Sequence, residues 1–78
     1  MELTVVIHEE RESFWSEVAE LPGCFATGRT LSELRVALAE GIGLYLWDLP
    51  AVLPDTPLAV GEATIQVTPP VPRRETPA

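Results

Sequence analysis

One segment of the sequence has the periodicity of a helix, and strand-like segments lie on both sides of it. Thr30-Leu31-Ser32-Glu33 is a capping box, in which the Thr30 hydroxyl accepts a hydrogen bond from the Glu33 amide and the Glu33 side chain reaches back to Thr30. A helix is therefore predicted from residue 31 to about residue 47, ended by Pro50. Its apolar face is predicted to comprise Leu31, Leu34, Leu38, Ile42 and Tyr45. Because one helix covers only one face of a sheet, we expect a two-layer α+β fold with the other sheet face open.

Four segments rich in apolar and β-branched residues are predicted to be strands, at residues 3–8, 14–20, 24–27 and 63–68. Residues 9–13 form a connector of hairpin length. Leu21-Pro22-Gly23-Cys24 is predicted to be a type II turn, because proline presets φ at the second position and glycine supplies a positive φ at the third. The element order is βββαβ, and the last strand is predicted to pair with the first in parallel through a right-handed crossover. The expected sheet order is 3-2-1-4, which is that of a truncated ribonuclease-H-like unit.

The length and composition limit the chain to one small domain. An apolar fraction of 46% in 78 residues is ordinary for a globular protein, so residues 1–68 are predicted to fold as one unit. Residues 69–78 contain four of the eight prolines and no aromatic residue, and we expect them to be a disordered tail. A core of this size contributes little stability, which favours a homodimer or a higher homo-oligomer.

The charge balance favours one kind of partner. Twelve acidic residues stand against five arginines and no lysine, and the net charge of −7 repels phosphate backbones. We therefore expect no direct binding to nucleic acid and an attraction to a basic protein.

No apolar stretch approaches the roughly 20 residues that cross a bilayer, and no signal core follows Met1. A single cysteine, Cys24, agrees with the reducing cytosol, so a cytoplasmic protein without membrane contact is predicted.

The side chains that usually carry catalysis are sparse. His8 and Glu10 share a strand face, but two potential ligands are only a weak indication of a metal site. Cys24 could be a nucleophile, but the sequence holds no second histidine that could act as its base, and Cys24 is expected to be buried under the helix. A metal-dependent ribonuclease of degenerate ribonuclease-H type would need several carboxylates to converge, and the first strand has none in its middle. We predict a protein that is not an enzyme and needs no metal or cofactor. The ribonuclease remains as an alternative, together with a self-associating orphan domain.

Apolar side chains on the open sheet face indicate a binding surface. If Phe14 and Val18 face the helix, Trp15 and Phe25 point away from it, together with Val6. The predicted partner-binding residues are these three with the neighbouring acids: Val6, Glu9, Glu10, Trp15, Glu17 and Phe25. Alternatively, the tail or the 50–58 loop covers part of this face. A second apolar surface is a ridge on the outer side of the helix, formed by Val36, Leu44 and Trp47. For Trp47 burial is the stronger expectation, because the loop with Leu53 and Leu58 lies close enough in sequence to cover it.

Residues 20–34, ELPGCFATGRTLSEL, resemble the signature of the HicB-like antitoxin family. The Leu-Pro-Gly-Cys turn followed by Gly-x-Thr-x-x-Glu carries the resemblance, which extends more loosely over residues 3–68. The resemblance implies a partial ribonuclease H fold without an active site, and a protein that binds and neutralises a small basic mRNA-cleaving toxin of HicA type. Many members add a C-terminal DNA-binding domain. This chain ends in a proline-rich tail, so the DNA-binding role is not expected here, and Arg29 stands where the family often has an acid.

Overall fold

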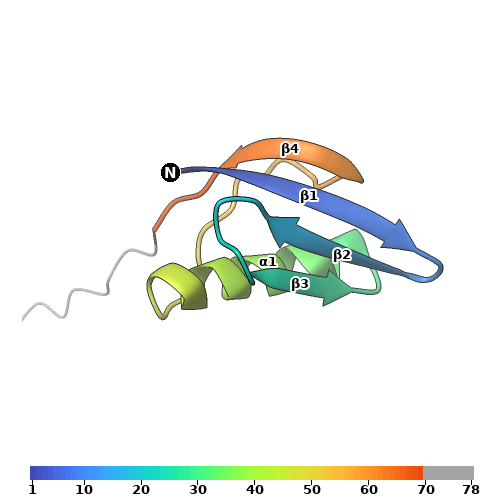
Figure 1. The fold of residues 1–78 in the computed structure, drawn as a ribbon, viewed down its shortest axis with the longest axis horizontal. Coiled ribbons are helices and arrows are strands. Elements are labelled where there is room, and N and C mark those ends of the chain that lie inside the picture. Colours follow the sequence, from blue (N-terminus) through green and yellow to red (C-terminus); the bar gives the residue numbers. More distant parts are fainter. Residues whose placement is uncertain (70–78) are drawn as a thin grey trace, which may run out of the picture.

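The computed structural model describes residues 1–69 and arranges them as four strands and one helix (Figure 1). The elements follow the predicted order, and they are β1 (Glu2–Glu10), β2 (Ser13–Val18), β3 (Phe25–Gly28), α1 (Leu31–Leu46) and β4 (Gly61–Gln66). The strands form one sheet in the order β3-β2-β1-β4, with α1 on one side, which confirms the predicted fold class and sheet order. The predicted disordered tail, except for Pro69, lies outside the described residues.

The β1–β2 hairpin is tighter than predicted. Glu10 pairs with Ser13, so the turn consists of two residues, Arg11 and Glu12, in place of a connector over 9–13. Arg11 has a φ of 27°, in the left-handed region that short hairpin turns require. The type II turn that follows β2 is confirmed, since Gly23 has a φ of 88° and the Cys24 amide donates to the Leu21 carbonyl oxygen at 3.0 Å.

The start of α1 is capped by Thr30 and Glu33. The Thr30 hydroxyl accepts from the Glu33 amide at 3.0 Å, as predicted. The Glu33 side chain, however, accepts from the amide of Arg29 at 2.9 Å and not from that of Thr30. The carboxylate thus reaches one residue further back than in the predicted box, and it satisfies an amide of the loop that leads into the helix.

We expect Thr30→Ala to lower the free energy of unfolding by about 1 kcal/mol, because the Glu33 amide would lose its acceptor at the helix start. Thr30→Ser keeps the hydroxyl and is the matched control, with little expected change. Chemical denaturation of the three proteins measures the difference. Equal stability of Thr30→Ala and the wild type would mean that water replaces the cap without loss.

The predicted apolar face of α1 is correct except at its C-terminal end. Leu34, Leu38 and Ile42 are fully buried, and Leu31 is partly buried. Tyr45 was predicted to be in the core, and this was wrong, because it is 50% exposed. In the last turns the buried side of the helix shifts to Gly43 and Leu46. The shift occurs because residues 49–51 fold back against Gly43.

The segment between α1 and β4 reverses the predicted direction of the last strand. The Ala51 amide donates to the Ala39 carbonyl oxygen at 2.9 Å, and the Arg35 guanidinium donates to the Thr56 carbonyl oxygen at 3.0 Å. Residues 47–60 therefore run back along α1 from its end towards its start. β4 then begins at the end of the sheet where α1 begins, and it pairs with β1 antiparallel. The predicted parallel crossover was wrong because it ignored this additional passage of the chain.

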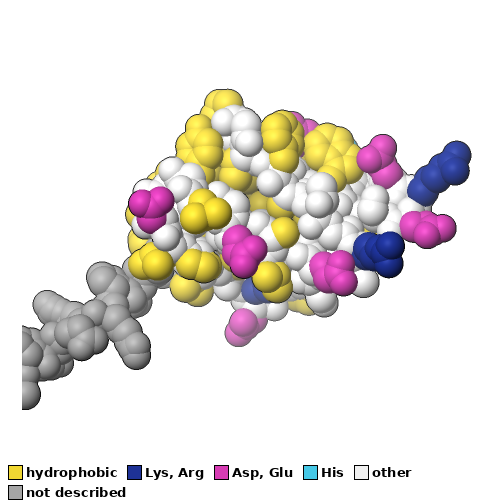
Figure 2. Space-filling model, turned by 90° about the horizontal axis from the view of Figure 1, so that it is seen from below, with side chains coloured by type: hydrophobic (Ala, Val, Ile, Leu, Met, Phe, Trp, Pro, Cys, Tyr) yellow, Lys and Arg dark blue, Asp and Glu magenta, His cyan; other side chains and the backbone are white. Residues whose placement is uncertain are grey.

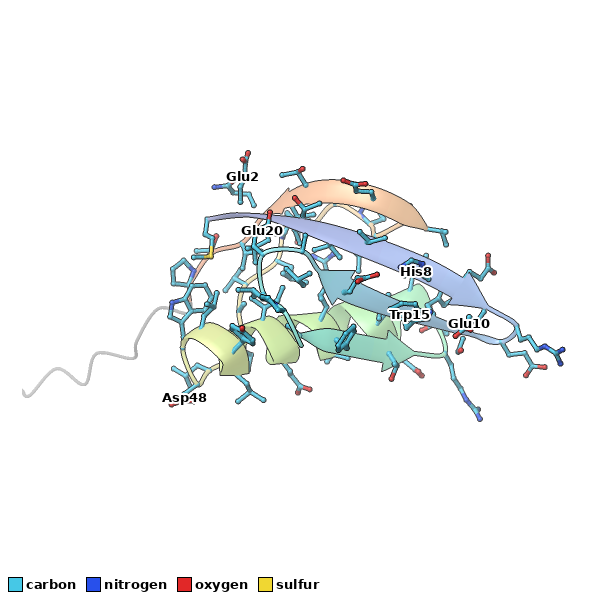
Figure 3. All side chains as sticks on the ribbon, in the orientation of Figure 1. Glu2, His8, Glu10, Trp15, Glu20 and Asp48 are labelled. Carbon is cyan, nitrogen blue, oxygen red and sulfur yellow. The ribbon has the colours of Figure 1, made fainter. Side chains whose placement is uncertain are left out.

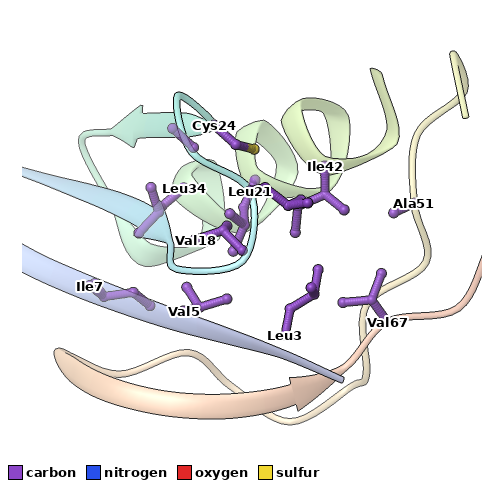
Figure 4. Close-up of a cluster of buried hydrophobic side chains, with 12 residues drawn as sticks. Leu3, Val5, Ile7, Val18, Leu21, Cys24, Leu34, Ile42, Ala51 and Val67 are labelled. Atoms are coloured by element: carbon purple, nitrogen blue, oxygen red, sulfur yellow. The ribbon is translucent and has the colours of Figure 1, made fainter. Parts of the chain in front are cut away.

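Two elements cover the core side of the sheet (Figure 4). Helix α1 packs against β2 and β3, and Leu53 and Leu58 of the returning segment pack on the same core cluster. The residues of β1 alternate, with Leu3, Val5 and Ile7 buried. On β2, Ser16 and Val18 are buried and Phe14 packs against the core, so the predicted inward face of this strand is confirmed. The two fully buried leucines of α1, Leu34 and Leu38, each contribute roughly 2 kcal/mol relative to exposure.

No helix among residues 1–69 combines the length and apolar character needed to cross a membrane.

Candidate functional site: an aromatic and acidic sheet face

The sheet face opposite α1, called the open face here, carries the candidate binding site. Val6 of β1 pairs with Glu17 of β2, and Glu17 pairs in turn with Phe25 of β3. Two residues further along β1, His8 pairs with Trp15 of β2. Paired residues point to the same side of a sheet, so these five side chains form one continuous patch across three strands. Their neighbours Ile7, Ser16 and Ala26 are buried on the other side, which confirms that the patch faces away from the helix.

Three rings form the centre of the patch. His8 and Trp15 stack with ring centroids 4.0 Å apart and an interplanar angle of 15°, and they lie side by side on β1 and β2 (Figure 3). Phe25 is tilted by 46° against Trp15 at a centroid distance of 6.4 Å. Phe25 is 59% exposed, whereas Trp15 is half-buried between its two neighbours. An exposed phenyl ring beside a supported indole is the kind of surface that interfaces use as an anchor.

A carboxylate is held beside these rings. The Glu17 carboxylate lies 2.9 Å from Nε2 of His8, and both side chains are partly exposed. The contact orients the imidazole, while one edge of Glu17 stays open to solvent. His8 was considered in the sequence only as a metal-ligand pair with Glu10. Its stacking on Trp15 and its contact with Glu17 depend on the cross-strand register, which the sequence alone does not display.

The predicted site residues divide between the two sides of the sheet. Val6, Trp15, Glu17 and Phe25 come together on the open face, and Glu10 shares their side at the hairpin end. Glu9 does not belong to the patch. It pairs with Phe14, whose side chain packs against the core, so Glu9 projects to the helix side of the sheet and is exposed beyond the core. Glu9 was grouped with Glu10 because the two are adjacent in the sequence, but successive residues of an extended strand point in opposite directions.

The strand positions of the open face carry negative charge. The alternation of β1, β2 and β4 places four glutamates on this side and neither lysine nor arginine: Glu2, Glu10, Glu17 and Glu62. Glu20 adds a fifth carboxylate at the border, where it accepts from the Thr4 amide at 2.7 Å and from the Thr4 hydroxyl at 2.9 Å. These two hydrogen bonds hold the pKa of the Glu20 carboxyl below its usual range.

Glu20 predicts a small acid-sensitive part of the stability. Since its folded-state pKa is lowered, its contribution is present above the unfolded-state pKa and is lost as the pH falls through the folded value. We expect Glu20→Gln to remove this part of the pH dependence of the melting temperature, measured from about pH 7 to about pH 3. Thr4→Val keeps the amide donor and removes the hydroxyl, so it should reduce the effect only partly. Parallel melting curves of Glu20→Gln and the wild type across this range would contradict the assignment.

The apolar surface continues from Phe25 around the edge of β3 onto α1. A groove of about 330 Å³, called the β3-edge groove here, is lined by Gly23, Cys24, Phe25, Gly41, Leu44 and Tyr45. Leu44 and Tyr45 are 64% and 50% exposed. On this side of the molecule, apolar side chains gather towards the C-terminal end of α1, whereas acidic side chains are spread over the whole face (Figure 2). Tyr45 was predicted to lie in the core, so its part in this surface was not expected.

The predicted ridge on α1 is only partly present. Val36 and Leu44 are strongly exposed, but Trp47 caps the helix and packs against the core. Leu44 belongs to the β3-edge groove, whereas Val36 lies beside Arg35 and Glu40 in a separate shallow depression. The open face and the β3-edge groove therefore form one connected surface through Phe25, and Val36 is not part of it.

The structure also locates the side chains considered for catalysis. Among residues 1–69, no three His, Cys, Asp or Glu side chains come close enough together to hold a metal ion. Cys24 is buried beneath α1, as expected, and desolvation raises the pKa of its thiol, which lowers its reactivity at neutral pH. The open face offers an exposed phenyl ring and carboxylates as contact groups.

Searches of protein-family models, of curated proteins and of solved structures returned no match to this chain.

Proposed function

We propose that this chain is an antitoxin-type binding module that sequesters a small basic protein on its open face. The observation that supports the proposal is the half-buried Trp15 with the exposed Phe25 beside the Glu17 carboxylate, on a face whose strand positions within residues 1–69 hold neither lysine nor arginine. The resemblance of residues 20–34 to HicB-like antitoxins suggests the class of partner, an mRNA-cleaving toxin of HicA type. On this proposal the protein is not an enzyme, and it acts in the cytoplasm, where such a toxin meets its substrate.

The physical argument has two parts. Aromatic side chains that are already held in place lose little conformational entropy on binding, so Trp15 and Phe25 are suited to anchor an interface. The RNA-binding surface of a ribonuclease must be basic, because it contacts phosphates. An acidic face competes for that surface, and the net charge of −7 accelerates the encounter at low salt.

The test is co-expression with the product of the neighbouring gene, if that gene encodes a small basic protein. We expect the two proteins to co-purify and the growth arrest caused by the basic protein to be relieved. Glu17→Lys should weaken binding and restore the arrest, because it places a cation at the centre of the patch. Glu40→Lys is the matched control, since it changes the net charge equally at an exposed position on α1. Absence of binding, or equal losses in both variants, would contradict the proposal.

The ribonuclease alternative makes an opposite prediction. Purified protein incubated with RNA and Mg²⁺ or Mn²⁺ should leave the RNA intact if the chain only binds proteins. Cleavage that is abolished by Glu17→Gln would overturn the proposal in favour of an enzyme.

A further inference from the structure

The outer edge of β4 offers a set of backbone hydrogen-bonding groups. β4 pairs with β1 on one side, and within residues 1–69 no strand pairs with its other side between Gly61 and Gln66. Beyond Gln66 this edge is closed, because Thr68 exchanges two backbone hydrogen bonds with Val52. The open stretch is therefore limited to the strand itself. An unpaired strand edge of this kind is a template for another strand.

The hydrogen bonds near the end of β4 establish which groups point outward. Met1 and Val67 exchange backbone hydrogen bonds at 3.1 and 2.7 Å. The N–H and C=O groups of Val67 therefore point towards β1. In an antiparallel ladder hydrogen-bonded pairs alternate with non-hydrogen-bonded ones. Consequently the N–H and C=O groups of the even-numbered residues point away from β1. Thr68 follows this rule, and the remaining outward-facing residues are Glu62, Thr64 and Gln66.

We propose that two copies of this chain associate through antiparallel pairing of their β4 edges, with the twofold axis at Thr64. In this register Thr64 faces Thr64 of the second copy, and Glu62 faces Gln66 of the second copy. Every outward N–H and C=O of the strand then has a partner, with two hydrogen bonds at each pair. The two four-stranded sheets become one continuous sheet, and this association does not depend on the toxin-binding role proposed for the open face.

Other registers of self-pairing are worse. A twofold axis at Glu62 places two carboxylates directly opposite each other, which is destabilising. A shift towards the C-terminus brings Thr68 into the ladder, although its N–H and C=O are already bonded to Val52. A shift towards the N-terminus moves Gln66 out of the strand overlap. The strand is thus self-complementary in one register, in which each carboxylate faces an amide.

The side chains on the helix side of β4 also favour a second copy of this chain as the partner of the edge. A groove of about 400 Å³ runs between β4 and the returning segment, with Val5, Ile7, Leu58, Val60 and Ile65 among its walls. Ala63 is exposed on this side, and α1 does not reach it. In the proposed register Ala63 lies opposite Ile65 of the second copy, at a non-hydrogen-bonded position where side chains approach closely. Each copy would therefore extend the apolar wall of the other copy's groove.

The test uses sedimentation of the full chain at about 0.15 M salt, where repulsion between two acidic chains is screened. We expect a wild-type dimer and a dissociation constant raised about tenfold by Gln66→Glu, which sets two glutamate pairs opposite each other across the interface. The double variant Glu62→Gln/Gln66→Glu exchanges the two residues and should restore the wild-type value. Both variants contain the Gln66→Glu substitution, which lies opposite Glu2 of the same chain, so effects within the monomer are common to both.

A second variant tests the edge without changing charge. Thr64→Pro removes an outward N–H and leaves the bonds to β1 in place, and proline is tolerated at such edge positions, so the fold should persist by circular dichroism while the dimer is lost. The Trp15→Ala/Phe25→Ala variant should remain a dimer. A wild-type protein that is monomeric up to millimolar concentration would overturn the proposal. So would a dimer that resists Thr64→Pro but dissociates in the Trp15/Phe25 variant.

Discussion

Gly43→Ala should destabilise the fold by about 3 kcal/mol, although alanine is the better helix former. A Cβ at this position would overlap the Leu49 carbonyl oxygen and would lie 2.6 Å from the Ala51 amide nitrogen and from the Pro50 Cα. All three atoms belong to the backbone, so no side chain can rotate away to make room. The gain of about 1 kcal/mol in helix propensity is too small to offset this displacement.

Gly41→Ala is the matched control for this variant, and the opposite sign is expected. A Cβ at residue 41 would meet the Cys24 sulfur and the Phe25 carbonyl oxygen at 3.7 Å, which is ordinary van der Waals contact. The substitution should therefore stabilise α1 by up to about 1 kcal/mol. Denaturant unfolding of the two variants beside the wild type measures both values. Equal shifts in the same direction would show that the 49–51 segment does not pack tightly on α1.

The double variant Trp15→Ala/Phe25→Ala should lose partner binding while keeping its fold. Both side chains lie outside the core cluster, and Phe25 is mostly exposed, so truncation opens no internal cavity. The loss of the stack with His8 should cost about 1 kcal/mol of folding stability at most. Affinity for the small basic partner should fall by about 3 kcal/mol or more if the pair anchors the interface.

The comparison for this variant is a substitution in the core. Leu38 is fully buried, and Leu38→Ala should lower the unfolding free energy by about 2–5 kcal/mol. Calorimetric titration with the partner and thermal melting, performed on each variant, separate the two effects. A collapse of stability in the Trp15/Phe25 variant would contradict the placement of these rings. Unchanged binding would move the interface to the Leu44–Tyr45 side of the β3-edge groove.

Local signals in the sequence were sufficient for most of the fold. The Thr30 cap, the Gly23 turn and the alternation around Val18 each depend on interactions within a few residues, and all three are present as predicted. The order of β3, β2 and β1 also followed, because meander strands pair with their sequence neighbours. The place of β4 beside β1 was predicted as well, but by way of a parallel crossover that the structure contradicts. The open-face position of Trp15 and Phe25 follows from the same alternation once the inward face of β2 is known.

Features that depend on long-range packing could not be predicted in this way. The direction of β4, the burial of Gly43 and the exposure of Tyr45 all result from the return of residues 47–60 along α1, and no periodicity encodes that path. The contact between His8 and Glu17, and the separation of Glu9 from the site, depend on the registration of two strands. The sequence by itself therefore determined the elements, their order and the outward side of β2, because these are local properties of the chain. The tertiary structure decided which side chains meet, because those contacts join residues that only packing brings together.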